Sequence, residues 1–311
     1  MQSAKKVSLL HNPTAGASHP NAEELLEIIQ KITGIKPSYF STKNADWKDA
    51  LSKRWDAVIL AGGDGTVGRG MRWLADRQTP IMILPLGTAN NIARSLGIEG
   101  DMDSLLSKLF TSSPRSIDVG SAKGPWGSKE FLEAVGIGSI AEGVSVSGPR
   151  PPTPIRLDMA RDDLRELVKN AEPISFELKV DGEKFTGEFL LVEVLNLSFT
   201  GPALRLAFQA SPDDGFLDVV FLEEKNRKAM LTWFGDKPEQ TVPPLTVIQG
   251  KKVKLLWQTG HLRIDSCVFL PSKTPAEVTI TLEPQSLRVF VPKRRDGAQS
   301  GRDRSSGARV A

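Results

Sequence analysis

The sequence of 311 residues contains one cysteine, one tyrosine and three histidines. Cys267 has no second cysteine to pair with, so an internal disulfide is excluded, and the histidines lack the spacing of a metal site. No apolar run approaches the roughly 20 residues that cross a bilayer. The first residues lead into a strand without the apolar core of a signal peptide. These absences predict a cytoplasmic protein.

The chain also lacks a strong excess of charge, because its formal net charge is +3. No basic stripe interleaved with aromatic residues is present, so a nucleic-acid partner is not expected. Residues 293–311 are rich in Gly and Ser, and we expect them to form a disordered basic tail that aids solubility. Contact of this tail with anionic lipid is the alternative. Its basic residues are Lys293, Arg294, Arg295, Arg302, Arg304 and Arg309.

Strand and helix patterns alternate through the first third of the chain. Apolar runs at 7–10, 56–61 and 81–84 are typical of buried strands, and residues 22–33 have the periodicity of an amphipathic helix. The alternation predicts an α/β domain with a doubly wound parallel sheet over residues 1–114, completed by 284–292.

From about residue 115 the pattern becomes β-rich. Short strand-like runs recur, among them 129–135, 278–282 and 287–291. They predict a second domain over residues 115–283 that is an antiparallel β-sandwich. The two-domain α/β plus β-sandwich organisation is the predicted fold class.

A glycine-rich turn follows the strand at 56–61. It reads Gly-Gly-Asp-Gly-Thr over residues 62–66 and precedes a predicted helix. Glycines let the backbone approach a bound group, and the helix N-terminus favours an anion. The turn therefore indicates phosphate binding, although a similar turn can simply close a tight corner.

Two further polar turns follow other strands of the same predicted sheet. Leu-Pro-Leu-Gly-Thr-Ala-Asn occupies residues 84–90, and Asn-Pro-Thr-Ala-Gly occupies residues 12–16. Because ligands bind beyond the carboxyl ends of the strands in such sheets, the three turns are expected to converge on one site.

With these motifs, and with Ser-Pro-Asp-Asp-Gly-Phe-Leu-Asp at residues 211–218, the sequence resembles the diacylglycerol kinase catalytic-domain family of lipid kinases. The resemblance extends over residues 7 to about 291. It implies that the first domain binds the nucleotide and that the second binds lipid, with the Pro-rich segment 148–154 helping to shape an acyl groove.

The resemblance also implies an ATP site between the domains. The residues expected at the nucleotide are Asn12, Thr42, Gly62, Gly63, Asp64, Gly65, Thr66, Val67, Gly68 and Thr88. Asp64 is expected to hold catalytic Mg²⁺ or to orient the transferred group, and the Mg²⁺ role is preferred because a carboxylate beside a triphosphate needs a cation between them.

A structural metal loop is implied for the second domain. The expected ligands are the Asp214 side chain and the backbone carbonyls of Ser211 and Phe216. Hard oxygen ligands of this kind suit Mg²⁺ or Ca²⁺. A solvated turn before a strand is the alternative.

One position departs from the family pattern. Bacterial relatives carry an acidic general base late in the second domain, in a pattern resembling Asp-Gly-Glu, whereas this chain has Asp265, Ser266 and Cys267. Cys267 takes the position of the presumed base, and a thiol with a pKa near 8.5 replaces a carboxylate poorly. Either Asp265 takes over the base role, or activity is weak or absent.

The function implied is that of an ATP-dependent lipid kinase, which transfers the γ-phosphate to a hydroxyl of diacylglycerol or a related lipid. Such an enzyme is expected to be cytoplasmic and peripheral to the membrane. A soluble phosphotransferase similar to NAD kinases, and a homologue with impaired catalysis that binds nucleotide or lipid, stay open as alternatives. A homodimer also stays open.

Overall fold

The computed structural model describes residues 5–16, 20–145, 155–235, 237–271 and 274–292. The Pro-rich segment 148–154 and the predicted tail lie outside the described residues. None of the helices in these ranges has the length and apolar content to span a bilayer.

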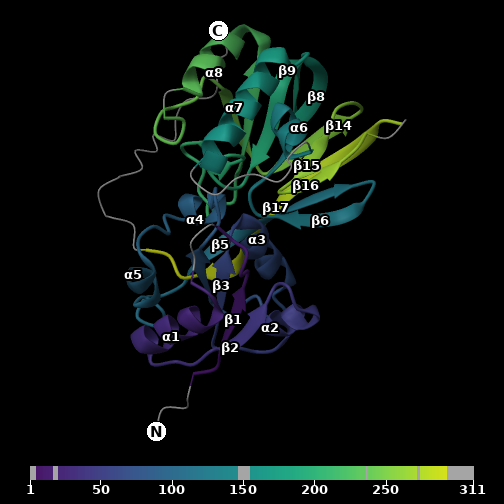
Figure 1. Cartoon of the computed structure of the whole chain (residues 1–311). Helices are drawn as coiled ribbons and strands as arrows, with labels where there is room; N and C mark the ends of the chain where they lie inside the picture. Colours follow the sequence, from purple (N-terminus) through teal and green to yellow (C-terminus); the bar gives the residue numbers. More distant parts are fainter. Residues whose placement is uncertain (1–4, 17–19, 146–154, 236, 272–273, 293–311) are drawn as a thin grey trace, which may run out of the picture.

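The first part of the chain forms a parallel sheet flanked by helices (Figure 1). The strand order is β2-β1-β3-β4, and every neighbouring pair in it is parallel. The strands are β1 (Val7–His11), β2 (Ser38–Ser41), β3 (Ala57–Gly62) and β4 (Ile81–Pro85). The helices are α1 (Ala22–Thr33), a 3₁₀ helix (Ala45–Lys48), α2 (Asp49–Ser52), α3 (Asp64–Trp73), α4 (Asn91–Ser95) and α5 (Met102–Leu106).

Local chemistry explains where these helices begin and end. Asn21 caps α1 in a capping box with Glu24, and Gly34 ends the helix in the left-handed conformation at φ 70°. Asp101 caps α5 by accepting a 2.7 Å hydrogen bond from the backbone N–H of Ser104. The apolar faces of the helices then join the sheet in one buried core.

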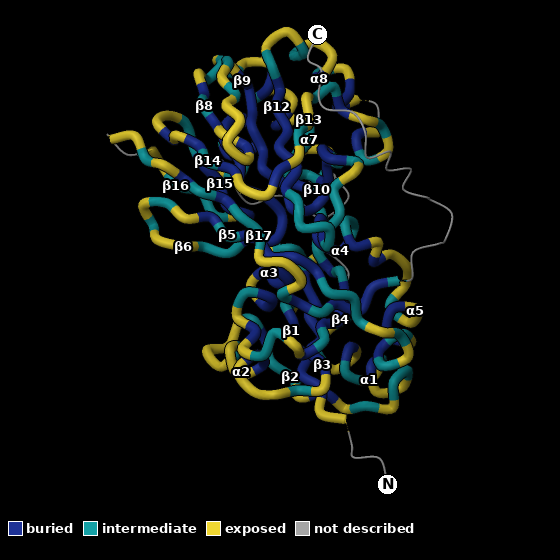
Figure 2. Tube along the Cα trace, turned by 180° about the vertical axis from the view of Figure 1, so that it is seen from behind, coloured by how far each residue is buried: buried dark blue, intermediate teal, exposed yellow. Residues whose placement is uncertain are grey.

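The second part is antiparallel and continues the same hydrogen-bonded sheet. Its strand order is β16-β15-β7-β9-β8-β14-β17. In addition, β12 pairs with β9 and β13, and β5 pairs with β17 and β6. Two cores fill it, and Figure 2 shows buried strands inside both halves of the molecule. The strands are β5 (Arg115–Gly124), β6 (Gly127–Phe131), β7 (Ala134–Gly138), β8 (Ile174–Val180), β9 (Glu183–Leu195), β10 (Phe199–Thr200), β11 (Leu204–Arg205), β12 (Leu217–Glu223), β13 (Thr246–Gly250), β14 (Lys252–Trp257), β15 (Leu262–Ile264), β16 (Cys267–Phe269) and β17 (Ala276–Val289).

Helices cover one end of the second part, where α7 packs against both α6 and α8 (Figure 1). These helices are α6 (Ser139–Ser145), α7 (Ile155–Asn170), a 3₁₀ helix (Glu224–Asn226) and α8 (Arg227–Trp233). The predicted fold class, a parallel α/β sheet followed by an antiparallel β-sandwich, is confirmed. The predicted domain boundaries stay predictions, although Val289 of β17 does pair with Ile81 of β4 in parallel.

Two predicted strand patterns were wrong. The run 129–135 is two strands, β6 and β7, because the chain bends between them and the N–H groups of Leu132 and Glu133 donate to Asp265 instead of to a neighbouring strand. The runs 278–282 and 287–291 belong to one strand, β17, whose register shifts between Glu283 and Leu287.

Candidate active site

The glycine-rich turn after β3 is packed against the turn after β4. A Cβ atom added to Gly87 would lie 2.3 Å from Gly63 Cα, so the two backbones approach more closely than side chains allow. Gly62 is equally confined, because its Cβ would lie 2.6 Å from the Cβ of Thr66. Gly65 has no atom within 4 Å of its added Cβ, which leaves open space beside the start of α3. The turn therefore presents backbone at the N-terminus of α3, the arrangement that suits an anion.

The turn after β4 is held by its own side chains. Asn90 accepts a 2.9 Å hydrogen bond from the Gly87 N–H, and its Nδ2 donates 2.9 Å to the Gly87 carbonyl. Asn90 adopts the left-handed conformation at φ 51°. Asn90 thus stabilises the turn, and its side chain does not cap α4.

Two of the predicted nucleotide positions, Asn12 and Thr42, lie just beyond the sheet edge. The Asn12 N–H donates to the Ala61 carbonyl at 2.9 Å, and the Thr42 N–H donates to the His11 carbonyl at 2.8 Å. Asn12 also accepts a hydrogen bond from the Thr14 hydroxyl at 3.0 Å. The carboxyl ends of β1, β2 and β3 therefore meet at one edge, as the sequence predicted for this fold.

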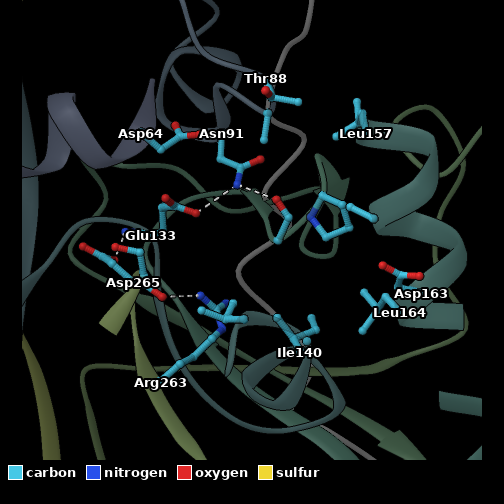
Figure 3. A pocket seen from close by; sticks show the side chains of 17 residues that line it. Asp64, Thr88, Asn91, Glu133, Ile140, Leu157, Asp163, Leu164, Arg263 and Asp265 are labelled. Atoms are coloured by element: carbon cyan, nitrogen blue, oxygen red, sulfur yellow. Dashed lines mark hydrogen bonds between the residues drawn. The ribbon is translucent and has the colours of Figure 1, made fainter. Parts of the chain in front are cut away.

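A cavity of about 360 Å³ lies between this edge and helices α6 and α7. Of the predicted site residues, Asp64, Thr88 and Asp265 line it, and the other predicted nucleotide positions do not. Figure 3 shows two different walls: polar side chains on one side, and apolar side chains of α7 with Asp163 on the other. The apolar lining comprises Ile140, Val144, Leu157, Ala160, Leu164 and Pro202.

Asp64 is the first residue of α3, and its carboxylate is tied to the next helix. Its Oδ1 accepts a 2.9 Å hydrogen bond from the Ile92 N–H at the start of α4. Burial raises the pKa of Asp64, hydrogen bonds from the backbone of Ile92 and Asn91 oppose the rise, and the charge of Asp265 adds to it. A cation beside Asp64 would relieve this cost, and a carboxylate oxygen is a ligand that suits a hard cation such as Mg²⁺.

Asp265 occupies the turn between β15 and β16, at φ 49°. Its Oδ2 forms an ion pair with Arg72 Nη1 at a distance of 2.7 Å. Its Oδ1 accepts a 2.9 Å hydrogen bond from the Glu133 N–H. The N–H groups of Leu132 and Ala134 complete its contacts, at 3.2 and 3.4 Å. Both carboxylate oxygens are therefore engaged in holding the chain between β6 and β7.

Glu133 and Asn91 line the cavity, and neither was among the predicted site residues. Asn91 Nδ2 donates to Glu133 Oε2 at 3.0 Å and to the Gly201 carbonyl at 2.9 Å, which joins the parallel half to the antiparallel half. Burial raises the pKa of Glu133 well above its ordinary range, the charges of Asp64 and Asp265 add to the rise, and Arg263 opposes it.

The one sequence signal for Glu133 is an acidic residue inside an otherwise apolar run, Phe-Leu-Glu-Ala-Val at 131–135. Burying a carboxylate is unfavourable without a partner or a role. Asn91 offered a weaker signal, since a helix N-terminus is an ordinary place for asparagine.

A buried ion pair supports the floor of the cavity. Arg263 donates to Glu193 through Nε at 3.1 Å and through Nη2 at 2.7 Å, and its Nη1 donates to the Asp265 carbonyl at 3.1 Å. A Cβ on Gly136 would lie 2.1 Å from the Glu193 carboxylate, so this glycine makes room for the pair. Arg263 thereby stabilises the turn that carries Asp265.

The remaining predicted residues lie away from the cavity. Cys267 begins β16, is half-buried and pairs in register with Ile264, and it does not line the cavity. In the predicted metal loop, Asp214 Oδ1 accepts the Phe216 N–H at 3.0 Å, while the neighbouring Asp213 accepts the Arg115 guanidinium at 2.6 Å. No cluster of three or more His, Cys, Asp or Glu side chains suited to a metal occurs in the described ranges. The ligand set of Ser211, Asp214 and Phe216, which relies on backbone carbonyls, stays a prediction.

Comparison with known proteins agrees with this arrangement. The diacylglycerol kinase catalytic domain matches residues 6–122, and the YegS C-terminal NAD kinase beta sandwich-like domain matches residues 136–291. The chain belongs to the diacylglycerol kinase catalytic-domain family. The family resemblance that the motifs carried is thereby confirmed, and the chain is a member of a kinase family with a nucleotide-binding domain.

Individual members of this family are distant in sequence. The diacylglycerol kinase of Bacillus subtilis (strain 168) is 28% identical over 238 residues, covering 71% of this chain and 75% of that protein. The diacylglycerol kinase of Staphylococcus aureus (strain RF122) is 22% identical over 305 residues, covering 93% of each. A crystal structure of a diacylglycerol kinase from Bacillus anthracis has a TM-score of 0.69 at 21% identity and covers 94% of this chain and 99% of that one. At that identity it supports the fold alone.

Proposed function

We propose that this chain is an ATP-dependent lipid kinase that transfers the γ-phosphate of ATP to a hydroxyl of diacylglycerol or a related lipid. The observation that carries the proposal is the cavity itself. It brings Asp64, at the N-terminus of α3 beside the glycine-rich turn, opposite an apolar wall from α6 and α7. An acyl chain would pack against the apolar wall, and a phosphate donor would lie at the polar wall.

The site residues have distinct proposed roles. Gly62 to Gly68 and the α3 N-terminus receive the phosphates, and Asn12, Thr42 and Thr88 contact the nucleotide. Asp64 holds Mg²⁺, which supplies charge neutralisation for the transferred phosphoryl group when it is bound. Asp265 holds the β6–β7 connection and Arg72 in place. The second metal loop, with Asp214 and the carbonyls of Ser211 and Phe216, would stabilise the second domain with Mg²⁺ or Ca²⁺.

A lipid acceptor also implies where the protein works. Diacylglycerol resides in the bilayer, so we propose that the chain is a cytoplasmic protein that contacts the membrane peripherally. A protein that phosphorylates a soluble dinucleotide would have no such need. The yeast NADH kinase shares this fold with a TM-score of 0.52 at 10% identity, a likeness that concerns the fold alone.

Transfer of radiolabelled γ-phosphate to a panel of acceptors tests the proposal. Diacylglycerol, phosphatidylglycerol, ceramide and NAD are offered separately to the wild-type chain and to Asp64→Ala. Label in a lipid, lost in Asp64→Ala, is the expected result. Label in NAD alone contradicts a lipid kinase, and retained ATP binding without any label identifies a homologue that has lost catalysis.

A further inference from the structure

The connection between β6 and β7 carries a carboxylate into the cavity. Glu133 follows Leu132 at the bend, and both of their N–H groups donate to Asp265 rather than to a strand. The bend is therefore fixed by Asp265, which Arg72 and Arg263 hold in turn. A side chain placed by this many backbone contacts has little freedom, which is what a residue acting on a substrate requires.

Glu133 differs from the two aspartates in how its oxygens are used. Its side chain lines the cavity although the residue is only 8% exposed, and Oε2 accepts from Asn91 Nδ2. From the described residues, Oε1 accepts no hydrogen bond. Both oxygens of Asp265 accept hydrogen bonds, and Asp64 lies in the glycine-rich turn at residues 62–66. Among the carboxylates of the polar wall, those of Asp64, Glu133 and Asp265, Glu133 therefore has the oxygen best available to an incoming hydroxyl.

Glu133 and Cys267 differ in their position relative to the cavity, which matters because Cys267 stands where the family resemblance implies an acidic base. The thiol lies outside the cavity lining, whereas the Glu133 carboxylate lies within it, on the same polar wall as Asp64 and Asp265 (Figure 3). A lipid whose acyl chain lies along α7 would bring its headgroup to this polar wall. The β6–β7 bend therefore places a carboxylate where such a headgroup would lie, and Cys267 does not.

We propose that Glu133 is the general base of the reaction, a catalytic residue that accepts the proton of the lipid hydroxyl. The inference rests on the proposed lipid kinase function. As the hydroxyl proton moves to Glu133 Oε1, a lone pair of the hydroxyl oxygen forms the bond to the γ-phosphorus. The bond from the γ-phosphorus to the bridging oxygen breaks, and its electron pair leaves with ADP. Glu133 returns the proton to solvent after product release.

The electrostatic surroundings suit this role. Asp64 and Asp265 face Glu133 with negative charge, Arg263 faces it with positive charge, and Asn91 contributes a neutral amide. Burial together with the two aspartates raises the pKa of Glu133, which makes its carboxylate a stronger base than a solvated one. Activity should therefore rise with pH as Glu133 loses its proton.

The experiment compares the full-length wild type with Glu133→Gln, Glu133→Asp and Glu133→Ala, using Glu188→Gln as the matched control. Glu188 is exposed on β9 and does not line the cavity, so the control makes the same chemical change elsewhere. Each protein is measured for kcat with diacylglycerol, for the Kd of a fluorescent ATP analogue, and by infrared titration of its protonated carboxyl groups.

We expect Glu133→Gln to lower kcat by about 10²–10⁴-fold, the usual contribution of a general base, while the ATP-analogue Kd changes less than about threefold. Glu133→Asp should retain part of the rate, and formate should restore part of it to Glu133→Ala. A high-pKa carboxyl band should be present in the wild type and in Glu188→Gln, and absent from Glu133→Gln.

Other results overturn the inference. A kcat in Glu133→Gln within threefold of wild type would show that the proton goes elsewhere, and an equal loss of ATP-analogue binding would show a structural role. A large gain of kcat in Cys267→Glu that also restores Glu133→Gln would place the base at position 267. If the wild type itself labels no lipid, the proposed function fails, and the infrared band still reports whether Glu133 titrates as inferred.

Discussion

Arg72 Nη1 lies 2.7 Å from Asp265 Oδ2, and this ion pair joins helix α3 of the parallel half to the β15–β16 turn of the antiparallel half. Their side chains are 21% and 9% exposed, so solvent weakens the interaction less than at an open surface. Gly68 leaves room for the pair, since a Cβ there would lie 3.1 Å from Arg72 Nη1. Helix α3, which begins at the glycine-rich turn, is thereby held against the β15–β16 turn at the cavity.

Breaking this pair should separate the two sides of the site. We expect Arg72→Ala and Asp265→Asn each to lower kcat and the free energy of unfolding. A double-mutant cycle measured by urea denaturation should give a coupling energy of about 0.5–3 kcal/mol, as for other contacting residues. Additive effects in the double mutant would contradict a direct interaction.

The two glycine turns offer a matched pair of alanine substitutions. Gly87→Ala places a Cβ 2.3 Å from Gly63 Cα and should destabilise the fold by about 1–3 kcal/mol, the cost of overpacking. The Cβ of Gly65→Ala has no atom within 4 Å, so this variant should keep the stability of the wild type or gain slightly. It should nevertheless weaken ATP binding, because the methyl group would occupy the space proposed for phosphate. Urea denaturation and nucleotide titration measure the two effects. Wild-type ATP affinity in Gly65→Ala would place the phosphates elsewhere.

The raised pKa of Glu133 predicts a pH-dependent cost to stability. Below the unfolded-state pKa of about 4.5, the carboxyl is protonated in both states and costs nothing. As the pH rises, the unfolded chain loses this proton before the folded protein does, so unfolding becomes more favourable until the folded pKa is passed. Glu133→Gln lacks this cost, so its Tm relative to wild type should increase as the pH rises above about 4.5. A difference in Tm that is constant with pH would contradict the shift.

The buried pair of Arg263 and Glu193 should be more sensitive than an exposed one. Their side chains are 2% and 0% exposed, so Arg263→Met leaves an unpaired carboxylate in the interior. We expect a loss of about 3–5 kcal/mol in the free energy of unfolding. Lys254→Met removes the partner of exposed Glu277 and serves as the control, with a much smaller expected effect. Equal losses in the two variants would contradict the distinction.

The sequence predicted the parallel sheet and the glycine-rich turn after β3 because the determining signals are local. An apolar strand, a glycine-rich turn and a helix follow one another within some twenty residues, and each leaves its own periodicity. The capping of α5 by Asp101 and the hairpin at Asp181 and Gly182 are local in the same way, since both depend on neighbours in the chain.

Glu133 could not be placed from sequence because its position depends on a distant residue. The pattern at 129–135 is that of one strand, and only the contact with Asp265, 132 residues away, breaks it into two. Helix α6 was missed for a related reason, since its small and polar residues carry no amphipathic pattern and its packing against α7 defines it. Contacts between residues far apart in the sequence could therefore be identified only from the structure.

The most direct test of the account is to block the apolar half of the cavity. Ala160 lines it from α7, so Ala160→Trp should fill the space assigned to the lipid without touching the phosphate turn. The measurement is kcat/KM for diacylglycerol in the wild type and in Ala160→Trp, alongside the Kd of a fluorescent ATP analogue. We predict that the wild type phosphorylates diacylglycerol and that Ala160→Trp loses about 10²-fold or more, with nucleotide affinity unchanged. Undiminished lipid phosphorylation by Ala160→Trp, or a wild type that phosphorylates only NAD, would contradict the account.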